Sequence, residues 1–394
     1  MYVIFVLFSK FMSALATYMC FYAYFCFFLC VADISFGLSD SLAKTSACFG
    51  IPLICRIDRM HATWFGGIDC GRSALKLVAF NSANPLEKIQ LVLPNALMPM
   101  PAINDPSTLA AIALDRIQLG ETGYLGGPSA ETLGDSGNVP QGMSDAWFSS
   151  AEHAAMVGIA LNHLASHDPR CVPGNGSVMF GLPVSATRKD NGLAYKGSIT
   201  AHLGMISPSV RLGRLEVSSQ ARGPMFDYML GDRGEVINDL SSQTWAVVEI
   251  GHYSTDCMVV RKGLYLEREH TSLPGMRLAA DYVQQELRRT GADGNYSQVR
   301  SVIETGRYMH RQESVDARQI RDAAASRLAR ELRVDLAPLL YSHLNTLDGV
   351  ILAGGGAELL AHHLSDVLPN ALVPTQPRFA VARGFAKAAF ATSK

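Results

Sequence analysis

Apolar runs alternate with helix-like segments along most of the chain after residue 60. Runs typical of buried strands lie at Thr63–Ile68, Ser177–Phe180, Leu212–Val217, Trp245–Ile250 and Val350–Ala353. Helical patterns lie at Ala151–His167, Leu278–Leu287, Ala317–Leu332 and Ala382–Ala391. Residues 94–150 are rich in Pro, Gly, Ser and Asp, and we expect long loops there. The alternation of strands and helices predicts an α/β fold.

Two of the strands run into a glycine-containing turn that leads to a second apolar run, as in a β-hairpin. The first turn follows Asp69 and the second follows Glu249, 180 residues later (249 minus 69). Because each turn lies between strands and begins with an acid, the pattern indicates a weak internal duplication. We expect two similar α/β halves that face each other across a cleft.

The first turn, Asp69-x-Gly71-x4-Lys76, carries groups that suit a phosphate. The small bulk of Gly71 lets backbone N–H groups approach phosphate oxygens. Asp69 could hold Mg²⁺ through water, and Lys76 could reach a phosphate as a point charge. An ordinary hairpin with a solvated lysine would contain the same residues, because Asp and Gly are common in turns.

The second turn repeats this chemistry. The hydroxyls of Ser254 and Thr255 suit a phosphate, and the carboxylates of Glu249 and Asp256 suit a metal-bound water, although a polar β-turn is the alternative. A third segment, 354–356, is three glycines between a buried strand and a helix, where a flat ligand or a phosphate can approach the backbone. The chain contains neither G-x-G-x-x-G nor G-x4-G-K-[ST], so Rossmann and P-loop sites are not supported.

The two turns and the glycine segment, in this order and spacing, resemble the superfamily of actin, sugar kinases and heat-shock chaperones. Within it the chain most resembles actin-like ATPases of the ParM/StbA plasmid-segregation type. Three further segments carry this narrower resemblance: Phe180-Gly181-Leu182-Pro183-Val184, Gly251-His252-Tyr253-Ser254-Thr255-Asp256 and Arg378-Phe379-Ala380-Val381-Ala382-Arg383-Gly384-Phe385. The resemblance covers about residues 63–391. It implies an actin-like (ribonuclease H-like) duplicated fold with a nucleotide cleft between two domains.

We expect the N-terminal domain at residues 60–240 and the C-terminal domain at 241–394, with the last helix, about 380–394, returning to the first domain. The resemblance implies ATP and Mg²⁺ as cofactors. Matching positions give Gln220, Glu249 and Asp256 as catalytic residues and Asp69 and Glu249 as metal ligands. The implied nucleotide-contacting residues are Asp69, Gly71, Arg72, Ser73, Lys76, Gly251, His252, Ser254, Thr255, Gly275, Gly354, Gly355 and Gly356.

Gln220 precedes the second turn, where superfamily members keep a residue that orients the attacking water. One position departs from the resemblance, because the second turn usually begins with Asp and here begins with Glu249. The extra methylene moves the carboxylate by roughly one bond length, enough to disturb a positioned water. The longer side chain leaves three alternatives. Mg²⁺ coordination shifts outward, Asp256 takes over more of the metal-binding role of Glu249, or hydrolysis is slow.

The implied function is an ATPase that assembles head-to-tail into filaments and moves plasmid DNA through an adaptor protein bound to centromere DNA. Direct nucleic-acid binding is not expected, and the net charge of −1 gives no support for a basic surface. A small-molecule kinase of the same superfamily is one alternative, although we find no second substrate segment. A non-hydrolysing actin-like scaffold protein is the other, and Glu249 leaves room for it.

The first 59 of the 394 residues do not belong to the resemblance. Phe11–Ala32 is 22 residues without a formal charge, long enough to span a bilayer as a helix. Because a strand-like run begins just after Met60, we expect residues 1–59 to be a start-site artefact, with a real membrane anchor at 11–32 as the alternative. The later cysteines, at 70, 171 and 257, form no Cys-x-x-Cys and suit a reducing cytoplasm.

Overall fold

The computed structural model describes residues 64–134, 145–169, 171, 175–187, 190, 192–206, 212–266, 271–341 and 346–393. By its contacts the chain divides into two compact units, Met1–Met60 and His61–Lys394, and every described residue belongs to the second. The leader at 1–59, with its possible membrane segment at 11–32, lies outside the described residues. None of the helices in the described ranges has the length and apolar character needed to cross a bilayer.

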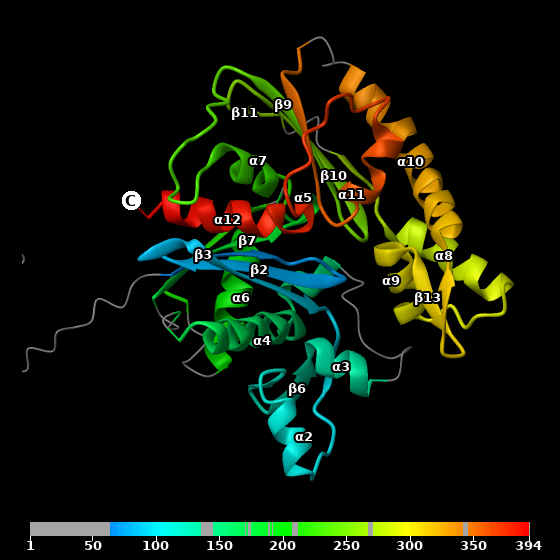
Figure 1. Cartoon of the computed structure of the whole chain (residues 1–394). Coiled ribbons are helices and arrows are strands. Elements are labelled where there is room, and N and C mark those ends of the chain that lie inside the picture. Colours follow the sequence, from blue (N-terminus) through cyan, green and yellow to red (C-terminus); the bar gives the residue numbers. More distant parts are fainter. Residues whose placement is uncertain are drawn as a thin grey trace, which may run out of the picture. The chain divides into compact units, whose positions relative to one another are not determined.

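The first sheet has five strands in the spatial order β3-β2-β1-β7-β8 (Figure 1). Their bounds are β1 (Trp64–Asp69), β2 (Ala74–Asn81), β3 (Asn84–Pro94), β7 (Gly176–Leu182) and β8 (Arg214–Ser219). β1 and β2 form the predicted hairpin, β3 pairs antiparallel with β2, β7 runs parallel to β1, and β8 runs parallel to β7. β1 and β7 are buried along their whole length, as expected for parallel strands covered on both faces.

The second sheet repeats this arrangement. Its strands are β9 (Thr244–Ile250), β10 (Ser254–Arg261), β11 (Leu264–Tyr265), β12 (Thr271–Pro274) and β15 (Gly349–Ala353). β9 and β10 form the second predicted hairpin, β11 and β12 pair antiparallel with β10, and β15 runs parallel to β9. In both sheets a hairpin is extended by a parallel strand on the side of its first strand, so the predicted duplication is confirmed in the topology.

Helices cover both faces of the first sheet because side chains alternate along its strands. Trp64 and Ile68 of β1 pack with α4 (Ala151–His167) and α6 (Leu193–Met205). Phe65, which points the other way, packs with α12 (Ala380–Ala391). Figure 1 shows α4 below this sheet and α12 above it, with α7 (Arg222–Met229) beyond α12.

The second sheet is also covered on both faces. Val248 and Ile250 of β9 belong to a core formed with four helices, α8 (Arg277–Arg289), α9 (Tyr296–Thr305), α10 (Arg318–Tyr341) and α11 (Ala357–Leu360). Val247 faces the other way and packs with Met225 of α7. Because Phe226 of α7 packs with the core of α12, α7 contacts both halves of the described chain.

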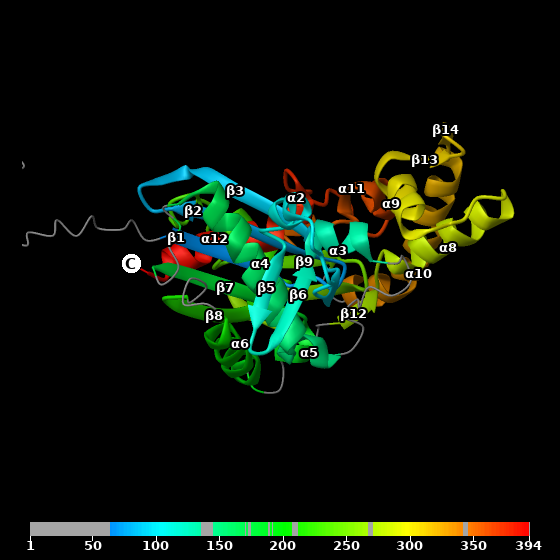
Figure 2. The same ribbon diagram turned by 90° about the horizontal axis from the view of Figure 1, so that it is seen from below.

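The expectation of long loops at 94–150 is wrong for the described part of that segment. A three-stranded sheet in the order β4-β6-β5 lies there with two helices and a 3-10 turn (Figure 2). The elements are β4 (Leu97–Pro99), α2 (Pro106–Ala111), β5 (Arg116–Leu119), β6 (Thr122–Gly126), α3 (Gly127–Leu133) and η2 (Asp145–Ser149). The Pro, Gly and Asp residues mark the ends of short elements: Asp105 caps α2, Pro106 begins it, and Gly120 turns the β5-β6 hairpin with a φ of +59°.

The sequence pattern also missed several elements outside that segment. These are β3, β11, β12, α6, α7, α9, α5 (Val184–Thr187), β13 (Arg307–His310), β14 (Glu313–Asp316), η5 (His362–Leu364) and η6 (Pro377–Phe379). The helix predicted at Ala317–Leu332 continues to Tyr341 as α10 with Pro338 inside it, a residue that normally ends a helix. The other predicted helices are confirmed as α4, α8 and α12.

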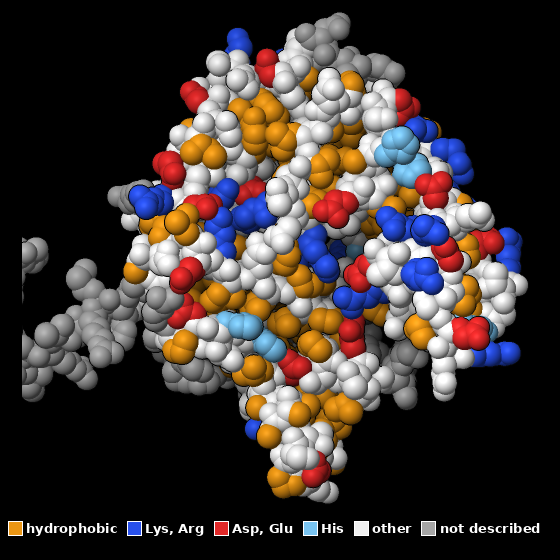
Figure 3. All heavy atoms as spheres, in the orientation of Figure 1, with side chains coloured by type: hydrophobic (Ala, Val, Ile, Leu, Met, Phe, Trp, Pro, Cys, Tyr) orange, Lys and Arg blue, Asp and Glu red, His pale blue; other side chains and the backbone are white. Residues whose placement is uncertain are grey.

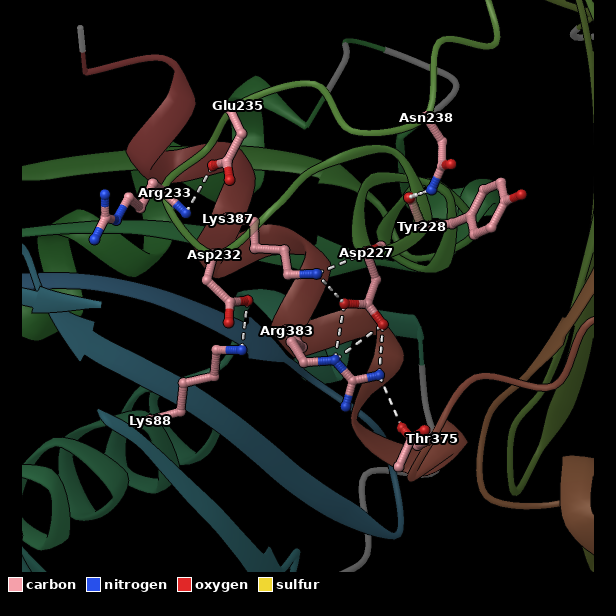
Figure 4. A network of polar contacts seen from close by, with 10 residues as sticks. All are labelled: Lys88, Asp227, Tyr228, Asp232, Arg233, Glu235, Asn238, Thr375, Arg383 and Lys387. Carbon is pink, nitrogen blue, oxygen red and sulfur yellow. Dashed lines mark hydrogen bonds and ion pairs between the residues drawn. The ribbon is translucent and has the colours of Figure 1, made fainter. Parts of the chain in front are cut away.

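The chain passes between the two sheets twice, through the segment containing α7 and through the segment that leads into α12. These two helices cross closely, because a Cβ on Gly384 would overlap the carbonyl oxygen of Gly223. Beside the crossing, Asp227 of α7 pairs with Arg383 and Lys387 of α12 (Figure 4). Arg383 Nε lies 2.8 Å from Asp227 Oδ1, and Lys387 Nζ also lies 2.8 Å from that oxygen. The predicted domain boundary, between 240 and 241, falls between α7 and β9 and stays a prediction.

The ion network at the crossing should be essential for stability. The side chains of Asp227, Arg383 and Lys387 are 6%, 12% and 8% exposed, so Asp227→Ala leaves two buried cations without a counter-charge. We expect the free energy of unfolding to fall by about 3–5 kcal/mol in urea titrations of the full chain.

Asp232→Asn is the matched control, because it removes a carboxylate of the same region from a more exposed pair. Lys88 Nζ lies 2.5 Å from Asp232 Oδ1, and these side chains are 20% and 33% exposed. The control should cost less than about 1 kcal/mol. Equal losses in the two variants would contradict the assigned role of Asp227.

Candidate functional site

The first turn is held rigidly at the ends of β1 and β2. Lys76 Nζ lies 2.7 Å from Asp69 Oδ2, and both side chains are almost buried. Asn95 Nδ2 donates to the carbonyl oxygen of Arg72 at 3.0 Å, and the Asn95 N–H donates to that of Ser73 at 2.9 Å. The backbone N–H groups of Gly71 and Ser73 make no hydrogen bond to another described residue. The turn therefore has its carbonyl groups engaged and N–H groups available, which suits an anion.

Gln220 completes the surroundings of Asp69. Its Nε2 donates to Asp69 Oδ1 at 2.7 Å, and both residues are buried. A carboxylate can only accept hydrogen bonds, so the amide nitrogen of Gln220 must face Asp69. The amide oxygen of Gln220 is thereby left to accept a hydrogen bond from another donor, such as a water molecule.

The second turn joins β9 and β10, with Glu249 directly opposite Asp256. The Gly251 N–H donates to the Ser254 carbonyl at 2.9 Å and closes the turn, while the Thr255 hydroxyl donates to the carbonyl of Pro274 at 2.9 Å. Glu249 and Asp256 are 6% and 1% exposed. Neither carboxylate oxygen of Asp256 makes a hydrogen bond of good geometry to a described residue.

The acids of the two turns act on one another electrostatically. Burial raises the pKa of Glu249 well above its ordinary value, the charges of Asp69 and Asp256 raise it further, and Lys76 opposes them. Burial also raises the pKa of Asp256 to about 6; the Ser272 hydroxyl lowers it and the charge of Asp69 raises it. Three buried carboxylates thus affect one another, and the charge of Lys76 opposes their effect on Glu249.

This donor set fits Mg²⁺ in chemistry, because Mg²⁺ prefers carboxylate oxygens and usually keeps several waters or phosphate oxygens. A cation would also reduce the repulsion among the acids. Within the ranges that the structure describes, no group of three His, Cys, Asp or Glu side chains is placed to hold a metal alone. An ion at Asp69 and Glu249 would therefore need ligands from water or phosphate.

The glycine segment lies against the second turn. Gly354 has a φ of +89°, and a Cβ there would lie 2.5 Å from Glu249 Oε1, so only glycine fits without strain. The Gly356 N–H donates to the Ile250 carbonyl at 3.1 Å. Gly355 is exposed, and no described atom lies within 4 Å of its Cβ position. Gly355 is therefore the residue of the three where a ligand can approach the backbone.

Gly275 packs directly against the backbone of the second turn. A Cβ on Gly275 would lie 2.6 Å from the Ser254 nitrogen and 2.7 Å from the Gly251 oxygen. The N–H groups of Gly275, Met276 and Arg277 donate to the carbonyls of Tyr253, Gly251 and His252, respectively. The glycine is required by this close approach, and its contact with the nucleotide stays a prediction.

Three side chains at the turns were not predicted from the sequence to have a role there: Asn95, Tyr253 and Arg277. The guanidinium carbons of Arg72 and Arg277 lie 5.8 and 5.4 Å from the centre of the Tyr253 ring. Burial lowers the pKa of His252 to about 4, and the charges of Arg277 and Lys76 lower it further, so His252 is neutral at pH 7. The sequence signal that could have revealed Arg277 is the proline and glycine before it, because they mark the start of α8.

One surface cavity is not part of this site. A cavity of 460 Å³ lies at the crossing of α7 and α12 and is lined by Lys88, Asp227 and Arg383 among others. None of its lining residues belongs to the predicted site. The chemistry of the two turns, rather than the size of a hollow, therefore defines the candidate site.

Part of the chain matches a known family model. The family model described as archaeal actin homologue MreB-like, C-terminal, matches residues 247–366. That range contains most of β9, the second turn and the glycine segment. A search of curated proteins finds no match.

Solved structures extend the likeness to most of the chain. The chain is similar to a ParM in a 15-stranded filament from Clostridium botulinum, with a TM-score of 0.64, 19% identity, and coverage of 83% of this chain and 99% of that one. The chain is also similar to an archaeal actin homologue in complex with ADP, with a TM-score of 0.61, 18% identity, and coverage of 82% of this chain and 98% of that one. For ParM from Bacillus thuringiensis with ATP, the TM-score is 0.57 and the identity 12%, and the match covers 84% of this chain and 99% of that one. The predicted actin-like fold class is confirmed by these likenesses.

Asp256 should make stability depend on pH. Because its folded pKa of about 6 exceeds the ordinary 3.8, the folded protein binds more protons than the unfolded chain between these values, and stability falls as pH rises through the window. Asp256→Asn removes this cost. We expect urea titrations to show a gain of up to about 3 kcal/mol at pH 7.5 and a much smaller gain at pH 4.5.

Asp281→Asn is the control, because it neutralises a carboxylate whose side chain is 58% exposed on α8. Its effect should be small and similar at the two pH values. An Asp256→Asn effect that is equal at pH 7.5 and pH 4.5 would contradict the assignment of a buried, protonatable Asp256.

Proposed function

We propose that this chain, whose fold is that of the actin-like proteins, is an ATPase that binds ATP and Mg²⁺ between its two turns. One observation carries the proposal: two turns from duplicated halves meet at a group of buried carboxylates, Asp69, Glu249 and Asp256, beside available backbone N–H groups. Such an arrangement suits a metal-bound polyphosphate. The ADP and ATP complexes of two similar structures support the same ligand class.

Each group of the site then has a role. The N–H groups of Gly71 and Ser73 and the ammonium of Lys76 would hold phosphate oxygens, with Arg72, Gly251 and Ser254 beside them. Asp69 and Glu249 would hold Mg²⁺, partly through water. The ion would supply charge neutralisation for the transferred phosphoryl group. Gly355, the exposed residue of the glycine segment, would contact the adenosine.

Gln220 is suited to orient the attacking water. Its amide nitrogen is fixed by Asp69 at 2.7 Å, so its oxygen has a defined direction in which to accept a hydrogen bond. Asp256, whose pKa is about 6, can exchange a proton near neutral pH. Positioning and charge stabilisation would supply most of the rate increase, as is usual in phosphoryl transfer.

We also propose that the protein assembles into head-to-tail filaments in the cytoplasm and positions plasmid DNA through an adaptor bound to centromere DNA. The similar ParM that forms a 15-stranded filament supports self-association. A heterologous contact that does not close into a ring gives an open helix. On the face shown in Figure 3, basic and acidic side chains are interspersed, which favours an adaptor over direct DNA binding.

Glu249 favours a second candidate, an actin-like scaffold that binds ATP without hydrolysing it. Its carboxylate lies on a longer side chain than the aspartate usual at this position and is buried against Gly354. Tight ATP binding without turnover would favour this candidate over the ATPase.

Glu249→Ala should abolish Mg²⁺-dependent hydrolysis while leaving the fold intact. We expect turnover to fall by about 10²–10³-fold, because one preorganised electrostatic group is lost, and phosphate release measures it. Removing a buried carboxylate should not lower stability, which circular dichroism and urea titration can verify. Glu358→Ala, at an exposed glutamate of α11, should retain turnover. Wild-type turnover in Glu249→Ala would refute the role of Glu249.

Assembly should depend on nucleotide. We expect light scattering of the full chain with Mg²⁺ to rise with ATP or a non-hydrolysable analogue above a critical concentration, and to rise less with ADP. With hydrolysable ATP the signal should decay as the nucleotide is consumed. Absence of ATP-dependent scattering across a wide range of protein concentration would contradict filament formation.

A further inference from the structure

The cavity beside the crossing of α7 and α12 lies outside the candidate nucleotide site and has a chemistry of its own. Four parts of the chain line it: β3, α7 with the segment that follows it, the segment that leads into η6, and α12. Its volume of 460 Å³ is within the range of sites that bind small molecules. The cavity is therefore built jointly by elements that lie far apart in the sequence.

The wall of the cavity carries an excess of positive charge. Lys88, Arg383 and Lys387 line it, and Asp227 is the one acid among the lining residues, which leaves an excess of two positive charges (3 minus 1). Asp232, outside the lining, pairs with Lys88 and offsets part of this charge. Basic side chains also gather around α12 and above β3 on the face shown in Figure 3. Such a concave, cationic surface attracts anions.

Asp227 holds Arg383 in place without using all of its donors. The Nε and Nη2 groups of Arg383 donate to the Asp227 carboxylate, and Nη2 also donates to the carbonyl oxygen of Thr375 at 2.9 Å. The third nitrogen, Nη1, makes no hydrogen bond to a described residue, and Figure 4 shows it turned away from Asp227. The guanidinium is thus fixed in direction with one donor group left over, which suits a phosphate oxygen.

Neutral polar side chains line the cavity together with these cations. The side chains of Gln90, Thr375 and Gln376 make no hydrogen bond to any other residue that the structure describes. An amide both donates and accepts, and so does a hydroxyl, so each of these groups can bind a hydroxyl group of a ligand. The wall therefore combines an anion site with hydrogen-bonding groups.

The backbone of Gln376 is strained at the cavity. Its φ is +51°, in the left-handed region that residues other than glycine seldom adopt. Its carbonyl oxygen accepts a hydrogen bond from the Phe379 N–H at 2.9 Å, so this conformation begins η6 and leads into α12. Strained residues gather at binding sites, and this one is among the residues that line the cavity.

We propose that this cavity is a second ligand site, separate from the nucleotide site, and that it binds a phosphate monoester of a small hydroxylated molecule. Lys88 and the unused nitrogen of Arg383 bind the phosphate, whereas Gln90 and Gln376 bind the hydroxyl groups. A phosphate with nearly two negative charges matches the excess of two positive charges, and a carboxylate supplies only one. The proposal goes beyond the ATPase function and does not depend on it.

Isothermal titration calorimetry of the full chain tests the site with three matched probes. Glucose 6-phosphate, glucuronate and glucose share a sugar body and carry a phosphate, a carboxylate or neither. We expect saturable binding of one glucose 6-phosphate per chain, weaker binding of glucuronate and no binding of glucose. No binding of glucose 6-phosphate at millimolar concentration would overturn the proposal, and equal affinity for glucuronate would overturn the choice of phosphate.

Lys88→Gln tests the position of the site. Since a hydrogen bond to a charged group is lost, the Kd for glucose 6-phosphate should rise about tenfold. Arg383→Lys keeps the charge beside Asp227 but lacks the additional guanidinium nitrogen, so it should weaken binding as well. Urea titration shows whether each variant is folded. An unchanged Kd in folded Lys88→Gln would overturn the site.

Lys196→Gln is the matched control. It removes a lysine from another surface ion pair, with Glu216 at 3.5 Å, and Lys196 does not line the cavity. This variant should bind glucose 6-phosphate as the wild type does, and a loss equal to that of Lys88→Gln would overturn the assignment. Saturating ATP with Mg²⁺ should leave the binding of glucose 6-phosphate in place. Competition between the two would show that the probe occupies the phosphate turns, and the proposal would then be wrong while the proposed function stands.

Discussion

The position of Asp69 is the constraint on which the rest of the described structure depends. Its carboxylate is held from two sides, by Lys76 at 2.7 Å and by Gln220 at 2.7 Å, at the end of a fully buried strand. Two more buried acids, Glu249 and Asp256, lie on the second hairpin, and burial together with the charge of Asp69 raises the pKa of each. Carboxylates are rarely buried without partners, since their desolvation is costly. A fold that gathers them at one place retains a destabilising group, which is the usual sign of a functional site.

The duplicated architecture explains how this gathering arises. Each sheet supplies one hairpin whose turn carries an acid at the end of a buried strand. The glycine segment follows β15, the parallel neighbour of β9, and Ala353 pairs with Glu249, so its backbone must lie beside the second turn. On the other side, α7 and α12 hold the two connections together through close glycine contacts and a buried ion network. The same fold thus provides a tightly packed crossing and a site to which both halves contribute.

The sequence predicted those parts of the fold whose local pattern and tertiary role agree. The buried strands, the two hairpins and α4, α8 and α12 have strong periodicity or long apolar runs. The segment after residue 94 was misjudged, because its elements are short and their caps, such as Asp105 and Pro106, use the same residues as loops. Asn95 and Tyr253 could not be found, since their roles come from contacts set only by the folded chain. The hydrogen bond from Gln220 to Asp69 and the place of Gly275 beside the second turn are likewise set only by the folded chain, and the role of Gln220 stays a prediction.

In the proposed function, the buried acids hold a metal-bound nucleotide between the two turns. Isothermal titration calorimetry of the full chain with ATP, with Mg²⁺ and with a chelator in its place, tests it most directly. We expect one ATP per chain in Mg²⁺ and an affinity at least about tenfold weaker in the chelator, a difference of about 1.4 kcal/mol. No binding at millimolar ATP, or the same affinity with and without Mg²⁺, would contradict it.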